Sequence, residues 1–251
     1  MPNYYSIRKN VYKPGFTSTF KLSRSKIDLF INCPKCFWLD RRLGIGQPPG
    51  YPFTLNNAVD LLLKKEFDIH RVKGKTHPLM KAYNINAVPL AHEKIDEWRD
   101  AMRRGITFHH QPTNLIISGG IDDVWINKNG EYIIVDYKST AKTGEVSIDA
   151  EWQKGYKRQM EVYQWLFIKN GYKVSKTGYF VYCNGKTDRK AFDGKLDFDI
   201  SILPYKGDTN WIESTLADIR DCLDQKNPPD SNSECDYCKY RKFIKESKIE
   251  S

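Results

Sequence analysis

The sequence predicts a mixed α/β domain, and three features of the chain support this prediction. Segments with apolar residues at helical spacing occupy much of its first half. Runs rich in Ile, Val and aromatic residues follow over residues 114–138, around the hairpin signal Asn129-Gly130. Helical and strand patterns then alternate toward the C-terminus. Helices before, across and after a mainly antiparallel sheet are typical of this class.

The N-terminal elements are predicted from capping and breaking residues. Residues 1–22 are polar and aromatic without periodicity, so we expect an irregular arm. Ser25, followed by Asp28, indicates a helix start. Pro34 suits the first turn of a second helical piece that ends at Gly44, and residues 46–52 are expected to form a loop.

Periodicity predicts the remaining elements. Apolar residues at helical spacing predict an amphipathic helix over residues 56–71, and a second helix is expected over 91–104. Strands are predicted over 114–118, 120–127, 131–138, 177–183 and 196–202, and helices over 152–169 and 210–225. The helix predicted over residues 56–71 has an apolar stripe that consists of Leu55, Val59, Leu62, Leu63 and Phe67.

The charge balance favours a polyanionic partner. The 251 residues include 40 Lys and Arg against 31 Asp and Glu, which gives a net charge of +9. Basic residues that neutralise phosphates release counterions, so nucleic acid is the expected partner class. No apolar run approaches the ~20 residues of a membrane helix, and residues 1–10 lack a signal-peptide stretch. We therefore expect an intracellular, cytoplasmic protein.

Two acids and a lysine lie at the ends of two apolar strands. Asp136 and Lys138 alternate on one face of the strand over 131–138. Asp122 lies directly opposite Asp136 only if the connecting turn has three residues, 128–130, with Gly130 in the left-handed conformation or an equivalent bulge. Adjacent carboxylates suit a hard divalent cation such as Mg²⁺ or Mn²⁺, which activates water and polarises a phosphodiester. Lys138 would then orient the attacking water, although solvated strand-end residues are the alternative.

Other polar residues are candidates for the same site. Glu66 shares the apolar stripe of its helix and is a candidate third metal ligand, with a salt bridge as the alternative; Asp60 could be the ligand instead. Gln159 and Tyr163 are spaced i, i+4 on one helix face and can hydrogen-bond a phosphate or a water network. A group of neighbouring basic residues could follow a DNA backbone or simply be solvated: Lys154, Lys157 and Arg158.

Two Cys-x-x-Cys pairs predict a second metal site. Cys33 and Cys36 lie near one end of the chain, and Cys235 and Cys238 near the other. Four thiolates suit structural zinc or an iron–sulfur cluster, with unpaired buried thiols as the alternative. This site would join the two ends of the domain structurally. The remaining cysteines are expected to be core residues: Cys183 and Cys222.

Together these motifs resemble the RecB-like branch of the PD-(D/E)XK nuclease superfamily, over roughly residues 23–240. The resemblance rests on Gly120-Ile121-Asp122, Val135-Asp136-Tyr137-Lys138-Ser139, Gln159 with Tyr163, and the segment from Ser25 to Leu39. It implies a restriction-endonuclease-like core with a mixed central sheet flanked by helices. By position, it assigns metal binding and DNA cleavage to Asp122, Asp136 and Lys138, with Gln159 and Tyr163 in support.

The chain departs from that branch in two places. Asp60 stands where the branch often has a His, with Glu66 further along, so the third ligand is open. Related CRISPR-associated and helicase-linked iron–sulfur exonucleases place one cluster Cys early and three late, whereas this chain offers two and two. The resemblance favours a [4Fe–4S] cluster, with Zn²⁺ as the alternative.

The resulting hypothesis is a Mg²⁺- or Mn²⁺-dependent deoxyribonuclease that processes DNA ends or single strands. A helicase or another recombination, repair or defence protein is a possible partner. The alternatives are a nucleic-acid-binding protein without catalytic activity and a structural subunit whose four cysteines bind zinc. We expect one nuclease domain, with residues 55–204 as the catalytic core and residues 23–54 and 205–251 as a Cys-bearing helical subdomain.

Overall fold

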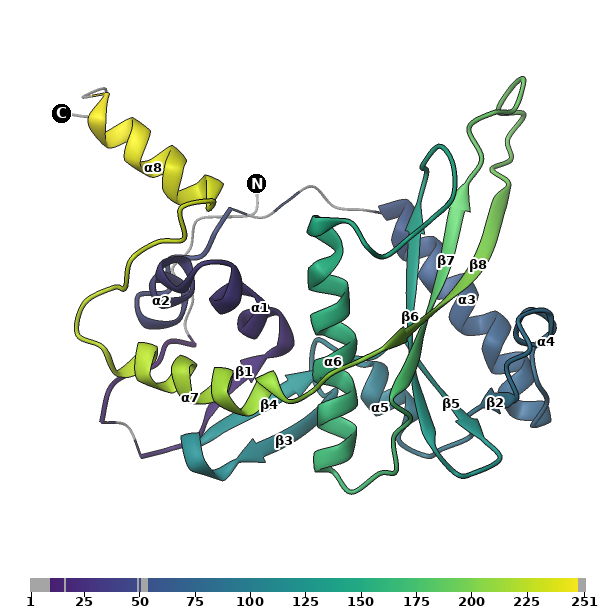
Figure 1. Cartoon of the computed structure of the whole chain (residues 1–251), viewed down its shortest axis with the longest axis horizontal. Helices are drawn as coiled ribbons and strands as arrows, with labels where there is room; N and C mark the ends of the chain where they lie inside the picture. The colour runs from purple at the N-terminus through teal and green to yellow at the C-terminus, as the bar shows by residue number, and fades with distance from the viewer. Residues whose placement is uncertain (1–9, 16, 49, 51–53, 248–251) are drawn as a thin grey trace. The chain divides into compact units, whose positions relative to one another are not determined.

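The computed structural model describes residues 10–247 except 16, 49 and 51–53. Most of the arm expected over residues 1–22, and part of the loop expected over 46–52, therefore lie outside the described residues. The end of the predicted arm is a strand, β1 (Phe20–Ser23). The chain divides into two compact units, which are described separately (Figure 1).

The first unit combines the described parts of residues 1–51, 109–117 and 210–251. It contains α1 (Arg24–Asn32), α2 (Pro34–Arg42), α7 (Trp211–Asp224) and α8 (Asp236–Glu246). Helices α1, α2 and α7 pack together around fully buried Phe37, Leu216 and Ile219. Extended Cys33 separates α1 from α2, and Pro34 opens α2 as predicted, where its missing N–H costs nothing.

The second unit, residues 52–108 and 118–209, is built on a five-stranded mixed sheet. The strand order is β2 (Ala87–Pro89), β5 (Asp123–Asn127), β6 (Tyr132–Thr140), β7 (Thr177–Gly185) and β8 (Phe198–Lys206). All neighbours are antiparallel except β6 and β7, which α6 (Lys154–Lys169) joins in parallel. This confirms the expectation of a crossing helix in a mixed sheet.

Helices cover both faces of this sheet. The long helix α3 (Thr54–Lys73) lies along one face and α6 lies along the other (Figure 1). Under α3, a core forms from alternate residues of the strands, including Trp125, Val135 and Val181. Because side chains alternate along a strand, residue 136 faces the side of α6. No helix among the described residues is both long and apolar enough to cross a membrane.

Several short elements differ from the prediction. The helix expected over 91–104 is only α5 (Ile95–Arg99), and a second three-stranded sheet, in the order β1, β4 (Leu115–Gly119) and β3 (Ile106–His110), was not fully predicted. Residues after α5 turn against the backbone of the Gly119-Gly120 segment. A Cβ on Gly120 would lie 2.3 Å from that of Ala101, and Gly105 has φ +70. This close approach ends the helix early. Three further short helices complete the described part of the fold: α4 (Pro78–Ala82), the 3₁₀ turn Gln111–Thr113 between β3 and β4, and the 3₁₀ turn Glu151–Gln153 before α6.

Candidate active site

The β5–β6 hairpin has the register that the sequence predicted. Asp123 pairs with Val135 and Ile126 with Tyr132, and the Asn127 N–H donates to the Glu131 carbonyl at 3.2 Å. The turn therefore contains residues 128–130, and Gly130 has φ +73. Continuing this register places Asp122, the residue before β5, opposite Asp136.

The two carboxylates are held differently. Asp136 is completely buried, and its Oδ1 accepts a hydrogen bond from Gln159 Nε2 at 2.8 Å. Asp122 is partly exposed, and its Oδ2 accepts the backbone N–H of Tyr137 at 2.9 Å. That contact fixes Asp122 beside the strand segment between Asp136 and Lys138. The hairpin thus presents one rigid and one more accessible carboxylate.

Lys138 places a positive charge near the carboxylates of both Asp136 and Asp122. Its ammonium group forms an ion pair with Asp136 and lies 4.6 Å from the centre of the Tyr156 ring. Burial alone lowers the pKa of Lys138, but the carboxylates of Asp136 and Asp122 outweigh burial and raise it above its usual value. Lys138 is therefore a protonated donor near neutral pH, suited to stabilising negative charge.

Helix α6 supplies the polar support behind Asp136. Gln159 donates to Asp136 and also approaches the Tyr163 hydroxyl at 3.3 Å. Tyr163 is buried and lies over Gly119, where a Cβ would come within 2.6 Å of its ring. Only glycine at this position leaves room for the ring, so Gly119 sets how closely its own backbone approaches Tyr163. The structure brings Gln159 and Tyr163 to the site, with Tyr163 as a buried support.

Helix α3 contributes an acid and a lysine. Lys64 Nζ contacts Asp60 Oδ2 at 2.7 Å and Asp122 Oδ1 at 3.3 Å. Burial, followed by the charge of Asp122, raises the pKa of Asp60. Burial lowers the pKa of Lys64, but Asp122 and Asp60 together raise it overall. Two lysines thus balance three carboxylates in this site. The sequence prediction did not include Lys64.

One comparison with known proteins identifies the family of the chain. The sequence model of the PD-(D/E)XK nuclease superfamily matches residues 21–243. The chain belongs to the PD-(D/E)XK nuclease superfamily. Its members are generally metal-dependent nucleases, which are hydrolases acting on nucleic acids. The order of Asp122, then Asp136-Tyr137-Lys138, corresponds to the acid and acid-x-lysine pattern in the superfamily's name.

Other comparisons add little to the superfamily match. No curated protein matches the chain. Among solved structures, the crystal structure of SSO0001 is similar, with 24% sequence identity and a TM-score of 0.30. That similarity covers 50% of this chain, which spans 50% of the length of SSO0001.

The structure does not bring Glu66 to the group formed by Asp122, Asp136 and Lys138. Its side chain is about half exposed and contacts His77 Nε2 at 2.9 Å. The apolar stripe predicted for this helix was wrong in part. Leu55 and Leu62 are exposed, and the buried face of α3 instead contains Leu63, Phe67 and Arg71. Asp60 and Lys64 follow the neighbouring row of the helix, which explains why Asp60 reaches the site.

A second fully buried acid adjoins Asp122 in the sequence. Asp123 is fully buried and receives ion pairs from Arg71 and Arg99 and a hydrogen bond from the Tyr137 hydroxyl at 2.7 Å. Arg99 also pairs with Asp68 at 2.9 Å. This network connects α3 and α5 to the hairpin. Its only sequence signal is the pair of consecutive aspartates.

The basic residues at the start of α6 are largely occupied by nearby acids. Lys154 pairs with Glu151 at 2.6 Å, and Lys157 pairs with Asp149 at 2.8 Å. Their charges are therefore partly balanced locally. A role for them and Arg158 in following a DNA backbone stays a prediction.

The four clustered cysteines form a separate candidate metal site in the first unit. The Sγ atoms of Cys33, Cys36, Cys235 and Cys238 all lie within 4.8 Å of one another and could bind a metal ion. Cys33 and Cys36 are buried, whereas Cys235 and Cys238 are partly exposed. The other two cysteines are buried in the packed interior, as expected: Cys183 and Cys222.

Proposed function

We propose that this PD-(D/E)XK protein is a Mg²⁺- or Mn²⁺-dependent deoxyribonuclease. The observation that carries the proposal is the arrangement of Asp122, Asp136 and Lys138 on one hairpin. Continued by one residue beyond Asp123–Val135, the hairpin register would set the two acids opposite one another, and the charges of both carboxylates raise the pKa of Lys138. A protein that only binds a polyanion has no need of paired carboxylates at its binding surface, because they repel phosphate.

The donor set fits a hard divalent cation. Asp122 and Asp136 supply carboxylate oxygens, which Mg²⁺ and Mn²⁺ prefer. Asp60 is the third candidate, since its pKa is raised partly by Asp122. Its contact with Lys64 places an ammonium charge between Asp60 and Asp122, where a cation is electrostatically favoured. A bound metal would supply a more acidic water and polarise the phosphodiester.

The protein side chains then have distinct roles. Asp136 is held by Gln159, whose amide lies against Tyr163, so the buried carboxylate cannot rotate freely. Lys138 remains protonated and would donate to the attacking water or to a phosphate oxygen, where it offsets the charge that develops during cleavage. The Tyr156 ring confines the lysine through its face. Gln159 and Tyr163 are therefore proposed as positioning residues.

The finer assignment is to the RecB-like branch, with cleavage at DNA ends or on single strands. It is supported by the resemblance of Gly120-Ile121-Asp122, the Asp136-to-Lys138 segment and the Gln159–Tyr163 pair to that branch. The net charge of +9 is compatible with a DNA substrate. The expected helicase or recombination partner rests on the resemblance alone.

A nuclease assay with purified full-length protein tests this proposal. Linear single-stranded DNA, linear duplex, circular DNA and RNA are each incubated with Mg²⁺, Mn²⁺ or EDTA. We expect cleavage of linear DNA that requires the divalent ion and is reduced on circles, which have no ends. Degradation of RNA in preference to DNA would contradict the substrate assignment.

Two lysine variants from the same hairpin supply the matched control. Lys138→Ala should abolish cleavage, whereas Lys128→Ala, at the exposed turn, removes the same charge and should leave cleavage intact. Cleavage that persists in Lys138→Ala or in EDTA would refute the assignment. DNA binding without cleavage in the wild-type protein would favour a nucleic-acid-binding protein without catalytic activity instead.

A further inference from the structure

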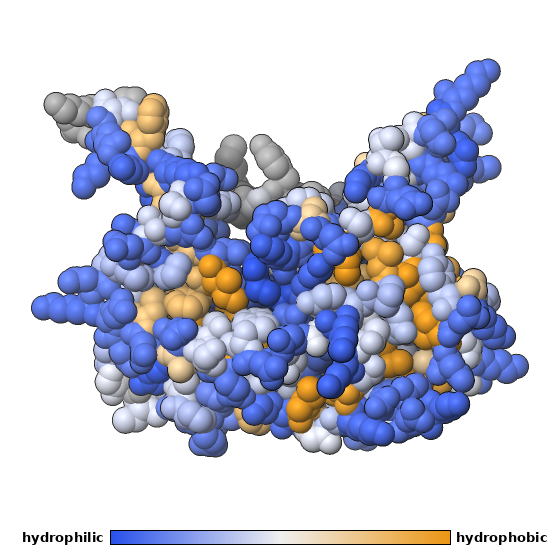
Figure 2. Space-filling view, viewed as in Figure 1, coloured by the Kyte–Doolittle hydropathy of each residue, from blue (hydrophilic) through white to orange (hydrophobic). Residues whose placement is uncertain are grey.

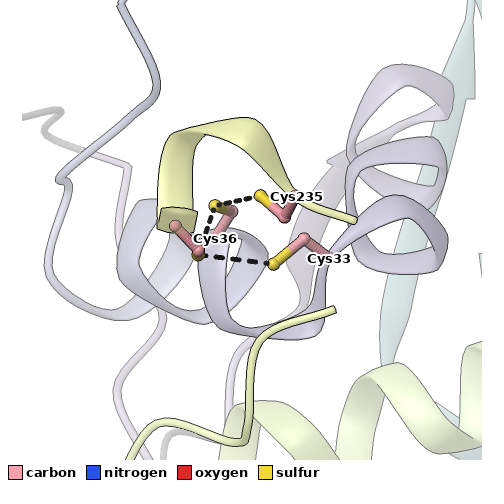
Figure 3. A group of neighbouring side chains, drawn as sticks. Cys33, Cys36 and Cys235 are labelled. Carbon is pink, nitrogen blue, oxygen red and sulfur yellow. Dashed lines mark hydrogen bonds between the residues drawn. The ribbon is translucent and has the colours of Figure 1, made fainter. Parts of the chain in front are cut away.

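The four clustered cysteines are presented by two equivalent local structures. Cys33 precedes α2 and Cys36 lies in its first turn, while Cys235 and Cys238 have the same places at the start of α8. In Figure 3, Cys33, Cys36 and Cys235 point toward one another. Because a helix N-terminus carries partial positive charge, it offsets part of the negative charge of thiolates that bind a metal ion there.

The spacing of the sulfurs distinguishes between the two candidate metal groups. The Sγ atoms of Cys33 and Cys238 lie 3.8 Å apart, and Cys36 Sγ lies 3.6 Å from those of both Cys235 and Cys238. Thiolates that share one tetrahedral ion at about 2.3 Å lie about 3.8 Å from one another. In a [4Fe–4S] cluster each thiolate binds a different corner iron, which separates the sulfurs to roughly 6 Å. All four Sγ atoms lie within 4.8 Å of one another, so their spacing is closer to that around a single ion than to that around a cluster.

We propose that these four cysteines bind a single tetrahedral Zn²⁺ ion and not the [4Fe–4S] cluster that the resemblance implies. The inference is independent of the proposed nuclease activity. Binding replaces thiol protons, which pass to solvent, and involves no change of oxidation state. The cysteines are free, and their sulfurs are too far apart for a disulfide, which requires about 2.05 Å.

Arg241 completes the surroundings of the sulfurs. Its Nη2 donates to Cys238 Sγ at 3.1 Å and lies 3.4 Å from Cys36 Sγ. Four thiolates around one divalent ion leave a net charge of −2, which a guanidinium group directed at two of the sulfurs offsets. Partners of this kind orient the ligands and tune a metal site.

The attachment of α8 also depends on this site. Helix α8 has no buried residue, and Tyr240 and Phe243 are 67% and 66% exposed. Figure 2 shows hydrophilic and hydrophobic side chains exposed together in this region, at the upper left. An isolated helix of eleven residues is marginal in water. We infer that the ion, more than apolar packing, holds α8 against α2.

Metal analysis of the whole protein tests the proposal directly. The protein is expressed with both iron and zinc supplied, purified without oxygen, and assayed for zinc, iron and acid-labile sulfide. We expect one zinc per chain, no visible cluster absorption, and a tetrahedral thiolate spectrum after cobalt substitution. A brown protein with about four irons and four sulfides per chain would overturn the proposal, as would a chain without bound metal.

A matched pair of cysteine variants tests the ligand set. Cys36→Ser should lose the zinc, whereas Cys222→Ser, a buried position on α7 of the same unit, should retain one zinc per chain. Equal zinc content in the two variants would contradict the assignment. If Cys36→Ser fails to fold, zinc release from the wild-type protein by a thiol-modifying reagent gives the same information.

Hydrogen exchange tests the attachment of α8. After the zinc is chelated from the wild-type protein, amides of α8 should lose protection, while those of α7, which buries Ile212, Leu216 and Ile219, should keep theirs. Continued protection of α8 without zinc would show that packing holds this helix, and would refute that part of the inference.

Discussion

The consecutive acids Asp122 and Asp123 should respond in opposite ways to the same chemical change. Asp123→Asn removes a fully buried charge while keeping the size of the side chain, so no cavity forms. Arg71 and Arg99 then lose their shared carboxylate, although Asp68 still pairs with both. Breaking a buried ion pair costs about 3–5 kcal/mol, and the remaining acid places this case near the lower value, about 3 kcal/mol.

Asp122→Asn should instead affect catalysis. The ion pair of Asp122 with Lys64 spans 3.3 Å between partly exposed side chains, and such pairs contribute about 1 kcal/mol or less. The asparagine oxygen can still accept the Tyr137 N–H. Losing a proposed metal ligand, in contrast, should lower the cleavage rate by roughly 100-fold or more.

Thermal unfolding and cleavage assays on both variants separate the two roles. For a chain of this size, about 3 kcal/mol corresponds to a Tm lower by about 6–12 °C for Asp123→Asn. We expect that variant to cleave DNA well below its Tm, and Asp122→Asn to unfold near the wild-type temperature but without cleavage. The reverse pattern, or equal effects in both assays, would refute the assignment of one acid to chemistry and the other to stability.

Three further outcomes are expected. Gly119→Ala forces a Cβ within 2.6 Å of the Tyr163 ring and should lower both Tm and cleavage; a wild-type rate would mean that the ring does not position the site. Asp60→Asn should raise the Mg²⁺ concentration needed for half-maximal cleavage, whereas Glu66→Gln should not, and equal shifts would contradict the placement of Glu66. Burial opposes ionisation of Asp68, but Arg99 and Arg71 outweigh it and lower its pKa, so its contribution to stability is present above pH about 4 and is lost as pH falls below that. Urea unfolding of Asp68→Asn should show a deficit of about 1 kcal/mol at pH 7 that shrinks at acid pH, and a constant deficit would count against this explanation.

The hairpin could be predicted from the sequence because its constraints are local. Side-chain alternation fixes the face of Asp136, and the length of one turn fixes what lies opposite it. The Asn-Gly signal alone would have suggested a two-residue loop, which sets Asp122 opposite Tyr137. Requiring the two acids to meet selected the three-residue turn that the structure contains.

The parts that could not be predicted depend on distant segments. On α3, apolar residues surround the helix, and exposed Leu55 and Leu62 compete with buried Leu63 in defining the stripe, so Glu66 was placed on the wrong face. Strand β1 is short and forms through pairing with β4, about ninety residues away along the chain. Helix α8 is amphipathic in sequence, yet none of its residues is buried, so its apolar side chains would have predicted a core face that the structure does not contain.

The unequal exposure of the cysteine pairs has a consequence for oxidative damage. Cys33 and Cys36 are 1% and 3% exposed, whereas Cys235 and Cys238 are reachable from solvent. If the site loses its ion, an oxidant meets the C-terminal thiols first. A sulfenic acid formed there can condense with the thiol of Cys36, whose Sγ lies 3.6 Å from those of both Cys235 and Cys238. Such a disulfide is reversible, so mild reductant followed by fresh zinc should restore the intact site.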